Sequence, residues 1–384
     1  MKRVVVVALL VTVAAAPLDA QNGGGRLPRK WLVAGIGALV ASAFATVYAL
    51  SFEGDIGGCS GGACVIPASA LGGAVVGFMI GSELDKLYSI RYRHAPPVTL
   101  RGRTLPLAVM PTDLAVRQRN VLVTGAEGLE VIRTGPALDR VGLRARGLRG
   151  IGPVTSDSVA NVLLVGTPVG LYRFPLRGDD LGTLAFPGEI SALATADDRL
   201  ALGLGPDLHL ARLADSLQPV AEAIPEDARI VDLAWHGADR LWVLTEDRLA
   251  AYAADGNGTL TPLGAFPLPA LGRRLALEDS VAYVATGSGG VYAVDVRDPA
   301  NLLERGNWSG ARFAYDVAVM DSTVYVAAGP EGLYLLRPGP DGFRAIGLSR
   351  SLGFVAAVAS DGEALYVLDR SGVQLRRIPR TGGR

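Results

Sequence analysis

The sequence predicts an all-β protein, a seven-bladed β-propeller preceded by an N-terminal signal peptide and a hydrophobic helical hairpin. The first observation is a pattern, apolar–x–Val–x–x–Gly–x–x–Gly–apolar–x–apolar, that recurs seven times between residues 121 and 370. Its copies begin at Val121, Val162, Leu200, Leu241, Val281, Val324 and Leu365, at intervals of 38 to 43 residues. A fixed period of about 40 residues with strand-like content is typical of a propeller, in which each repeat forms one four-stranded blade. The other two observations, a targeting pattern and a pair of uncharged apolar runs, lie ahead of the repeats.

Residues 1–20 have the pattern of a secretory signal peptide. Lys2 and Arg3 precede an apolar run, and Ala20 is a small residue at a suitable cleavage position. The run is too short to span a membrane comfortably, so we expect cleavage before Gln21. A polar, glycine-rich segment, 21–30, follows.

Residues 31–93 predict a hydrophobic helical hairpin, with helices at about 31–52 and 65–88. The first uncharged run, Trp31 to Phe52, is long enough to span the core of a bilayer. In the second run Gly73, Gly77 and Gly81 recur at every fourth position, so they would share the helix face on which a partner helix packs. This stretch resembles the glycine-zipper segments of bacterial envelope proteins. The alternative is a soluble pair of apolar helices packed against the propeller.

The hairpin contains both cysteines, Cys59 and Cys64, and its orientation is ambiguous. In an oxidising compartment the two thiols form a candidate disulfide, and on the cytoplasmic side they would stay reduced. Basic residues on both flanks of the hairpin favour cytoplasmic flanks, whereas a cleaved signal peptide places the propeller outside the cytoplasm. We give the signal peptide more weight, because the first targeting segment usually dominates.

Residues 94–97 form a proline-containing linker, residues 98–379 the propeller, and residues 380–384 a tail. The last repeat ends with its third strand near Ile378, which leaves too few residues for a fourth. We therefore expect the segment 98–110 to supply the missing outer strand and to close the ring. Trimming either end would then destabilise the whole propeller.

Two of the repeats allow a more specific comparison. The third strand that begins at Val291 runs into Asp295-Val-Arg-Asp-Pro299, and Tyr315-Asp-Val-Ala-Val319 precedes the next copy. These stretches resemble the LVIVD-repeat propeller family, whose third strand runs into Asp-Val-Ser-Asp-Pro. The resemblance is faded in the other five repeats. It implies a secreted or surface-attached propeller without known catalysis, and no cofactor is expected.

The composition and the motifs exclude several functions. The formal net charge is zero, so no global field attracts nucleic acid. The three histidines have no partner at metal-ligand spacing, and no nucleophile elbow is present. Counting back from each second strand instead places Asp113, Asp232, Arg273 and Asp316 at the mouth of the central channel. Together they could bind a cation or a polar ligand; alternatively, the aspartates bond nearby backbone N–H groups where the inner strands begin.

The leading functional prediction is a non-catalytic, membrane-anchored scaffold in the bacterial cell envelope, with the propeller periplasmic or on the surface. Its predicted partners are the membrane and an envelope protein or small ligand, and not nucleic acid. One alternative is a propeller enzyme, a metal-assisted or lactonase-like hydrolase, that uses the channel mouth. Another alternative is an assembly factor for outer-membrane proteins. Propellers host many unrelated functions, so the fold alone does not choose among these.

Overall fold

The computed structural model describes residues 95–117, 119–157, 161–176, 182–213, 217–219, 223–255, 258–340 and 342–380. The predicted signal peptide, the polar segment, the hairpin with its cysteines and glycines, and residues 381–384 of the tail lie outside these ranges. Among the residues described, there is no helix with the length and apolarity that crossing a membrane requires.

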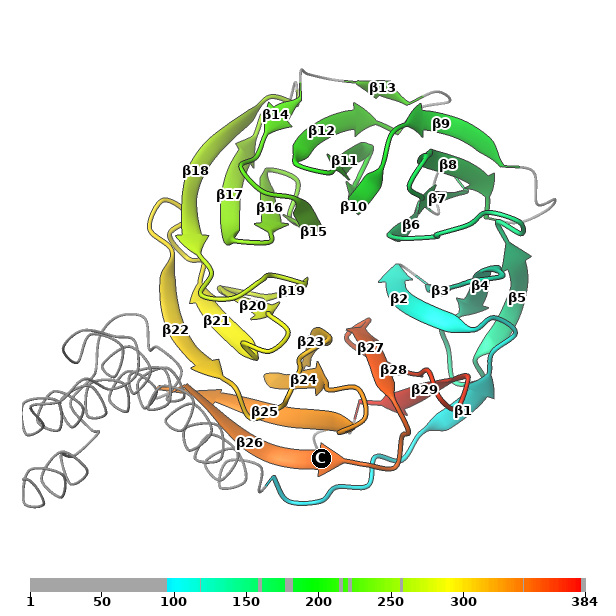
Figure 1. The fold of residues 1–384 in the computed structure, drawn as a ribbon, viewed down its shortest axis with the longest axis vertical. Helices are drawn as coiled ribbons and strands as arrows, with labels where there is room; N and C mark the ends of the chain where they lie inside the picture. Colours follow the sequence, from blue (N-terminus) through cyan, green and yellow to red (C-terminus); the bar gives the residue numbers. More distant parts are fainter. Residues whose placement is uncertain are drawn as a thin grey trace, which may run out of the picture. The chain divides into compact units, whose positions relative to one another are not determined.

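Seven antiparallel sheets are arranged around a central channel, which makes the described chain a seven-bladed propeller (Figure 1). In each blade the first strand lines the channel, and the following strands lie progressively further out. Blade 1 consists of β2 (Pro111–Arg117), β3 (Asn120–Gly125), β4 (Gly128–Arg133) and β5 (Asp139–Arg144). Blade 2 consists of β6 (Val154–Asp157), β7 (Val162–Gly166), β8 (Gly170–Pro175) and β9 (Thr183–Pro187). Blade 3 consists of β10 (Ile190–Ala196), β11 (Arg199–Leu204) and β12 (Asp207–Arg212), with two short outer strands, β13 (Gln218–Pro219) and β14 (Ile224–Pro225).

The next three blades have four strands each. Blade 4 consists of β15 (Ile230–His236), β16 (Arg240–Thr245), β17 (Arg248–Ala254) and β18 (Leu260–Pro267). Blade 5 consists of β19 (Arg274–Glu278), β20 (Val281–Ala285), β21 (Val291–Asp295) and β22 (Leu303–Trp308). Blade 6 consists of β23 (Asp316–Met320), β24 (Thr323–Ala327), β25 (Leu333–Gly339) and β26 (Gly342–Ser349). Blade 7 combines β27 (Val355–Ser360), β28 (Ala364–Asp369) and β29 (Gln374–Pro379) with β1 (Arg103–Pro106) from the other end of the described chain.

The core lies between neighbouring blades, where the apolar positions of the repeat meet. One cluster joins Tyr283 and Val291 of blade 5 to Val324, Val326 and Tyr334 of blade 6. The middle strands are therefore buried on both faces, and all the residues of β20 and β28 are buried. This packing explains why the second and third strands of the repeat are almost continuously apolar and leave polar residues to the turns.

The glycines of the repeat form the turns between the second and third strands. Gly287 in blade 5 and Gly329 in blade 6 have φ angles of 60° and 56°, a left-handed conformation that glycine adopts without strain. The same two residues pair with the chain where it enters the next inner strand, Gly287 with Ala314 just before β23 and Gly329 with Val355 at the start of β27. These glycines thus fix the positions of the loops around the channel mouth.

The ring closes through β1, which pairs antiparallel with β29, from Arg103 opposite Arg377 to Pro106 opposite Gln374. This strand lies within the segment 98–110 that the sequence analysis assigns to closure. Ahead of β1, the chain also pairs with β26. The Val98 N–H donates to the Leu348 carbonyl at 3.0 Å, and the Leu348 N–H donates to the Pro96 carbonyl at 2.9 Å. The described chain is thus fixed to blade 6 before it completes blade 7.

Candidate functional site

A cavity of about 710 Å³ occupies the centre of the ring, and the inner strands of all seven blades line it. The small residues of these strands, such as Ala115, Ala192 and Ala234, leave room for it. Several inner strands carry a β-bulge at the end where they enter the channel; in blade 4 it falls between Ile230 and Asp232. A bulge re-aims the side chains that follow it, so it helps to set which residues face the channel.

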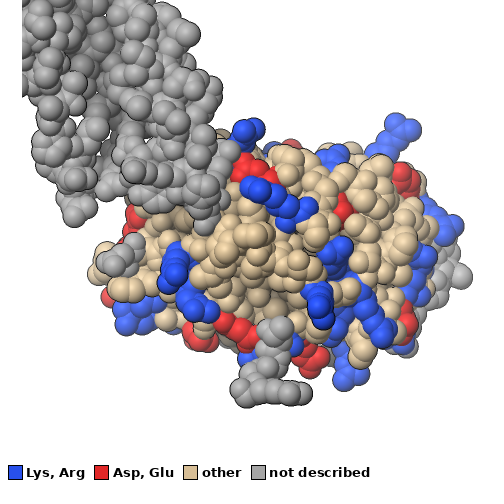
Figure 2. All heavy atoms as spheres, turned by 90° about the horizontal axis from the view of Figure 1, so that it is seen from below, with Lys and Arg blue, Asp and Glu red and all other residues tan. Residues whose placement is uncertain are grey.

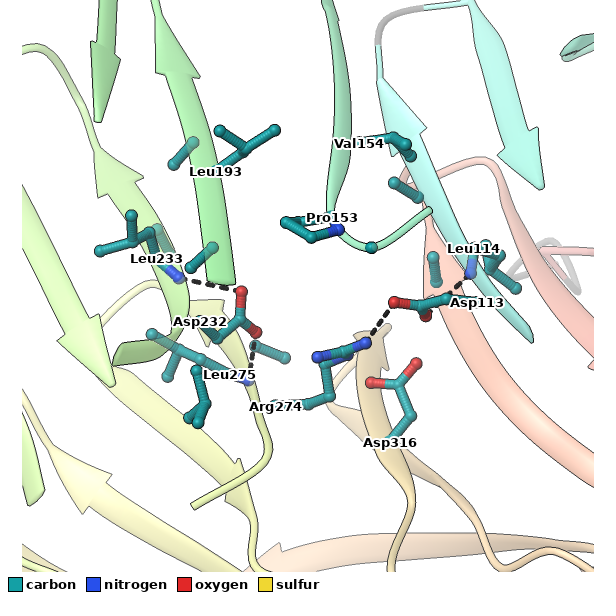
Figure 3. Close-up of a pocket in the computed structure, with 18 of the residues that line it drawn as sticks. Asp113, Leu114, Pro153, Val154, Leu193, Asp232, Leu233, Arg274, Leu275 and Asp316 are labelled. Atoms are coloured by element: carbon teal, nitrogen blue, oxygen red, sulfur yellow. Dashed lines mark hydrogen bonds and ion pairs between the residues drawn. The ribbon is translucent and has the colours of Figure 1, made fainter. Parts of the chain in front are cut away.

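Three of the four residues predicted at the channel mouth line this cavity: Asp113, Asp232 and Asp316. The fourth prediction is wrong by one position, because the arginine in the cavity is Arg274 and not Arg273 (Figure 3). Arg274 lies opposite Ala285, just as Asp316 lies opposite Ala327 in the next blade. In a strand, a shift of one residue moves a side chain to the other face.

Asp232 and Asp316 each connect the inner strands of two blades. Asp232 accepts the N–H of Leu233 in its own strand at 2.9 Å and that of Leu275 in the next blade at 2.8 Å. Asp316 accepts the N–H groups of Val317 at 2.8 Å and Val358 at 2.9 Å. These are backbone bonds of the kind expected if the aspartates have a structural role. The two carboxylates therefore join blade 4 to blade 5 and blade 6 to blade 7.

Asp113 is used differently, because it forms an ion pair with Arg274 across the channel (Figure 3). Its other oxygen accepts the N–H of Leu114 at 2.8 Å. Asp113 is in blade 1 and Arg274 in blade 5, and their side chains are 26% and 35% exposed. The guanidinium of Arg274 also interacts electrostatically with Asp232 and Asp316. A single arginine of the protein itself thus interacts with all three carboxylates and offsets part of their negative charge.

Burial changes the protonation of the two connecting aspartates. It raises the pKa of Asp232, against the opposing effects of Arg274 and of the backbone hydrogen bonds. Asp316 is only 6% exposed, and burial raises the pKa of its carboxyl to about 7, although Arg274 and the two backbone N–H groups lower it. Near neutral pH, therefore, Asp316 exchanges a proton while it holds blade 6 to blade 7.

This shift predicts a pH dependence of stability that the Asp316→Asn variant should lack. Because the folded-state pKa of about 7 lies above the ordinary value of 3.8, the stabilising contribution of the protonated carboxyl is complete below pH 3.8 and disappears as the pH rises through 7. The free energy of unfolding of the wild type, minus that of the variant, should thus fall by about 4 kcal/mol across this range. Urea unfolding of both proteins at several pH values measures this difference. A difference that does not change with pH would contradict the shift.

Two features near the channel are absent from the sequence prediction. Arg117 lines the cavity at the far end of β2, where its Nε donates to the Thr155 hydroxyl at 3.3 Å and burial lowers its pKa. On the face where the inner strands begin, Phe313, Tyr315 and Phe354 form a row of rings with centroid separations of 4.5 and 5.3 Å. Arg273 stacks on Phe313, with its guanidinium 4.9 Å from the ring centroid. We call these four residues the aromatic row.

The aromatic row comes from loops that the repeat pattern does not cover. Residues 309–315 lead into β23, residues 350–354 lead into β27, and Arg273 directly precedes β19. The turn glycines lie beneath the rings: a Cβ atom on Gly287 would approach Phe313 to 2.9 Å, and one on Gly329 would approach Tyr315 to 2.6 Å. The sequence contains one sign of this row, because an aromatic residue directly precedes two consecutive inner strands, Tyr315 before β23 and Phe354 before β27.

The described part of the chain contains no group of three or more His, Cys, Asp or Glu side chains placed to hold a metal ion. At the channel mouth, Arg274 lies among the carboxylates that such an ion would need (Figure 3).

Comparison with solved structures agrees with the architecture. The chain is similar to the WD40 β-propeller domain of Doa1, with 15% identity and a TM-score of 0.55 over 73% of this chain and 97% of that one. It is also similar to a chain of the mitotic checkpoint complex, with 12% identity and a TM-score of 0.61 over 75% and 98% of the two chains. The computationally designed protein Ika8 matches with 12% identity and a TM-score of 0.51 over 73% and 98%. No family model and no curated protein matches the sequence. At these identities the comparisons show the fold alone, and the chain is a seven-bladed β-propeller.

Proposed function

We propose that this protein is a non-catalytic scaffold, anchored to a membrane of the bacterial cell envelope, whose propeller binds a protein partner outside the cytoplasm. The observation that carries the proposal is that the channel-mouth carboxylates are already engaged. Asp232 and Asp316 bond backbone N–H groups of adjacent blades, and Asp113 pairs with Arg274. These interactions make the ring rigid, and they favour a scaffold over a hydrolase that needs free carboxylates at the mouth. Recognition is then left to the surrounding loops.

The aromatic row is the surface that best fits a protein partner. Aromatic residues and arginine are enriched at the centres of protein interfaces, because they bury a large area with little loss of conformational entropy. Leu271, two residues before Arg273, is 64% exposed. A chain of the mitotic checkpoint complex is among the similar structures, which supports protein binding as a use of this fold.

The test is site-specific photocrosslinking in cells that produce the full chain. A photoreactive phenylalanine analogue at Phe313 is expected to give a discrete adduct with one protein, and Arg273→Glu in the same chain should abolish it. The control places the analogue at Leu303, which is 56% exposed on the outer strand β22. Equal labelling from both positions, or no adduct from Phe313, would contradict the proposed binding face.

The proposed location depends on the sequence ahead of the propeller. The signal-peptide pattern of residues 1–20 and the uncharged runs within 31–93 support an anchored, extracytoplasmic propeller. The glycine-zipper and LVIVD-repeat resemblances support the same location. When protease is added to intact spheroplasts, it should degrade the propeller even in the absence of detergent. Protection that is lost only when detergent is added would place the propeller in the cytoplasm.

A further inference from the structure

The outer edge of blades 6 and 7 is rich in arginine. The segment 95–102 and the strands β1, β25, β26 and β29 include no aspartate or glutamate. Figure 2 views the ring from this edge and shows basic side chains spread across it, with acidic side chains in smaller groups. We call the arginines of this edge the basic rim: Arg101, Arg103, Arg337, Arg344, Arg376 and Arg377.

Within the basic rim, arginines lie directly opposite one another. Arg103 pairs with Arg377 in the β1–β29 ladder, and Arg337 pairs with Arg344 in the β25–β26 ladder. Like charges at such positions repel each other and destabilise a sheet. None of the six arginines forms an ion pair with a carboxylate among the described residues. The six arginines of the rim are therefore not paired with a described carboxylate, although Arg376 donates to the Ser351 hydroxyl at 3.1 Å and Arg377 interacts with Tyr366.

One similar pair elsewhere has a different environment. Arg199 lies opposite Arg212 in blade 3, but Arg199 donates to the carbonyl groups of Ala238 and Asp255 and stacks on Trp235. Its guanidinium is thus occupied within the protein. In the basic rim, by contrast, Arg101, Arg103 and Arg344 are exposed.

The chain enters the propeller at this same edge. Ala95 packs against the core between blades 5 and 6, and residues 96–98 run along β26. The sequence ahead of this point contains two long uncharged runs, the second of which ends at Ser82. Even fully extended, residues 83–94 reach no more than about 40 Å. If the runs insert in a bilayer, this length is the largest distance that can separate Ala95 from the end of the second run.

We propose that the basic rim binds the headgroups of anionic lipids. Arginine pairs phosphate in a bidentate geometry, and clustered basic residues next to a membrane anchor are attracted to an anionic leaflet. The lipid phosphates would relieve the repulsion within the two arginine pairs. This inference rests on the proposed membrane anchoring, because the anchor brings the rim to the lipid.

The test measures amide hydrogen exchange of the full chain in nanodiscs of phosphatidylcholine, with and without phosphatidylglycerol. Phosphatidylglycerol is expected to slow exchange several-fold in peptides that cover 95–106 and 342–350, and high salt should weaken this effect. The triple variant Arg101→Gln, Arg103→Gln, Arg344→Gln should lose the response. A matched triple variant at exposed arginines outside the rim, Arg119→Gln, Arg133→Gln, Arg149→Gln, should retain it.

Identical exchange in the two lipids, or an equal loss of response in both triple variants, would overturn the proposal. Failure of the anchor gives a different result, because the chain would then not enter nanodiscs of phosphatidylcholine alone. In that case, salt-sensitive cosedimentation with phosphatidylglycerol vesicles still tests the rim. Cosedimentation that the first triple variant loses supports the proposal, and no cosedimentation of the wild type overturns it.

Discussion

Replacement of Asp369 by alanine is expected to lower the free energy of unfolding by about 3–5 kcal/mol. Asp369 ends β28 and is 2% exposed. Its oxygens accept the N–H groups of Gly353, Phe354 and Gly372 at 3.1 to 3.2 Å, and the Gln374 side chain donates to it at 2.8 Å. Alanine would leave these donors without an acceptor and would disconnect the loop before β27 from the turn before β29.

Denaturant unfolding of the wild type and Asp369→Ala near neutral pH measures this loss. The matched control is Asp298→Ala, because Asp298 lies in an exposed turn where its carboxylate accepts the N–H of Ala300 at 3.1 Å. We expect little change in the control. If the two variants are equally stable, the hydrogen bonds of Asp369 do not hold the seventh blade together.

The same carboxylate should contribute to acid unfolding. Burial alone would raise its pKa, but the Gln374 side chain and the backbone N–H groups outweigh burial and lower the pKa to about 2. Since this value lies below the ordinary 3.8, the contribution of Asp369 is complete above pH 3.8 and is lost as the pH falls through 2. The stability gap between the wild type and Asp369→Asn should accordingly narrow in acid.

The Gly102→Ala variant is expected to weaken the closure of the ring. A Cβ atom at residue 102 would overlap the backbone oxygen of Arg377 and would lie 3.2 Å from a side-chain carbon of Ile378. Neither β29 nor the start of β1 can move without breaking their pairing, so we expect a loss of about 3 kcal/mol and a clear fall in melting temperature.

Gly152→Ala is the control for this substitution. A Cβ atom there would meet its nearest neighbours, the oxygens of Gly166 and Ile190, at 3.7 and 3.8 Å, which is ordinary contact. Calorimetry of the two variants separates a specific effect on closure from the general effect of removing a glycine. In Gly102→Ala, hydrogen exchange should also become faster in β29. A melting temperature equal to that of the control would show that residues 103–106 are not needed to close the ring.

The seven blades could be predicted because every blade needs the same apolar strand positions and the same glycine turns, and these recur in the sequence as the repeat. Apolar residues such as Val324 and Val326 fill the space between blades, and glycines such as Gly329 form the turns. The position of the closing strand followed from the missing outer strand of the last repeat. These features depend on local pattern and on counting, and both are visible in one sequence.

The error at Arg273 shows where counting fails. Gly287 and Gly329 are equivalent turn residues, and Arg274 and Asp316 lie at equal distances before them. The apolar start at Val281 lies one residue earlier relative to its glycine than the start at Val324. Counting from the glycines would have selected Arg274. Bulges in other inner strands change the count again, so no single offset serves all the blades.

Interactions across the ring have no local signal. Arg274 and Asp113 are 161 residues apart, and only the closure of seven blades brings them together. The Val358 N–H that donates to the Asp316 carboxylate belongs to a strand with a bulge after Val355, and the sequence pattern does not reveal this bulge. The aromatic row likewise comes from loops of different lengths. The channel could therefore be placed from the sequence, but its internal pairing could not.

The position of β1 also determines how the ring responds to mechanical force. In the β1–β29 pair, Arg103 lies opposite Arg377, so tension on the chain ahead of Ala95 acts first on the bonds to β26 and then at this end of β1. The hydrogen bonds would then break one after another, as in a zipper, and not all together as in shear. Since β1 is the strand that closes the ring, a pull on the chain ahead of Ala95 would open the propeller between blades 7 and 1 while the other six sheets keep all their strands.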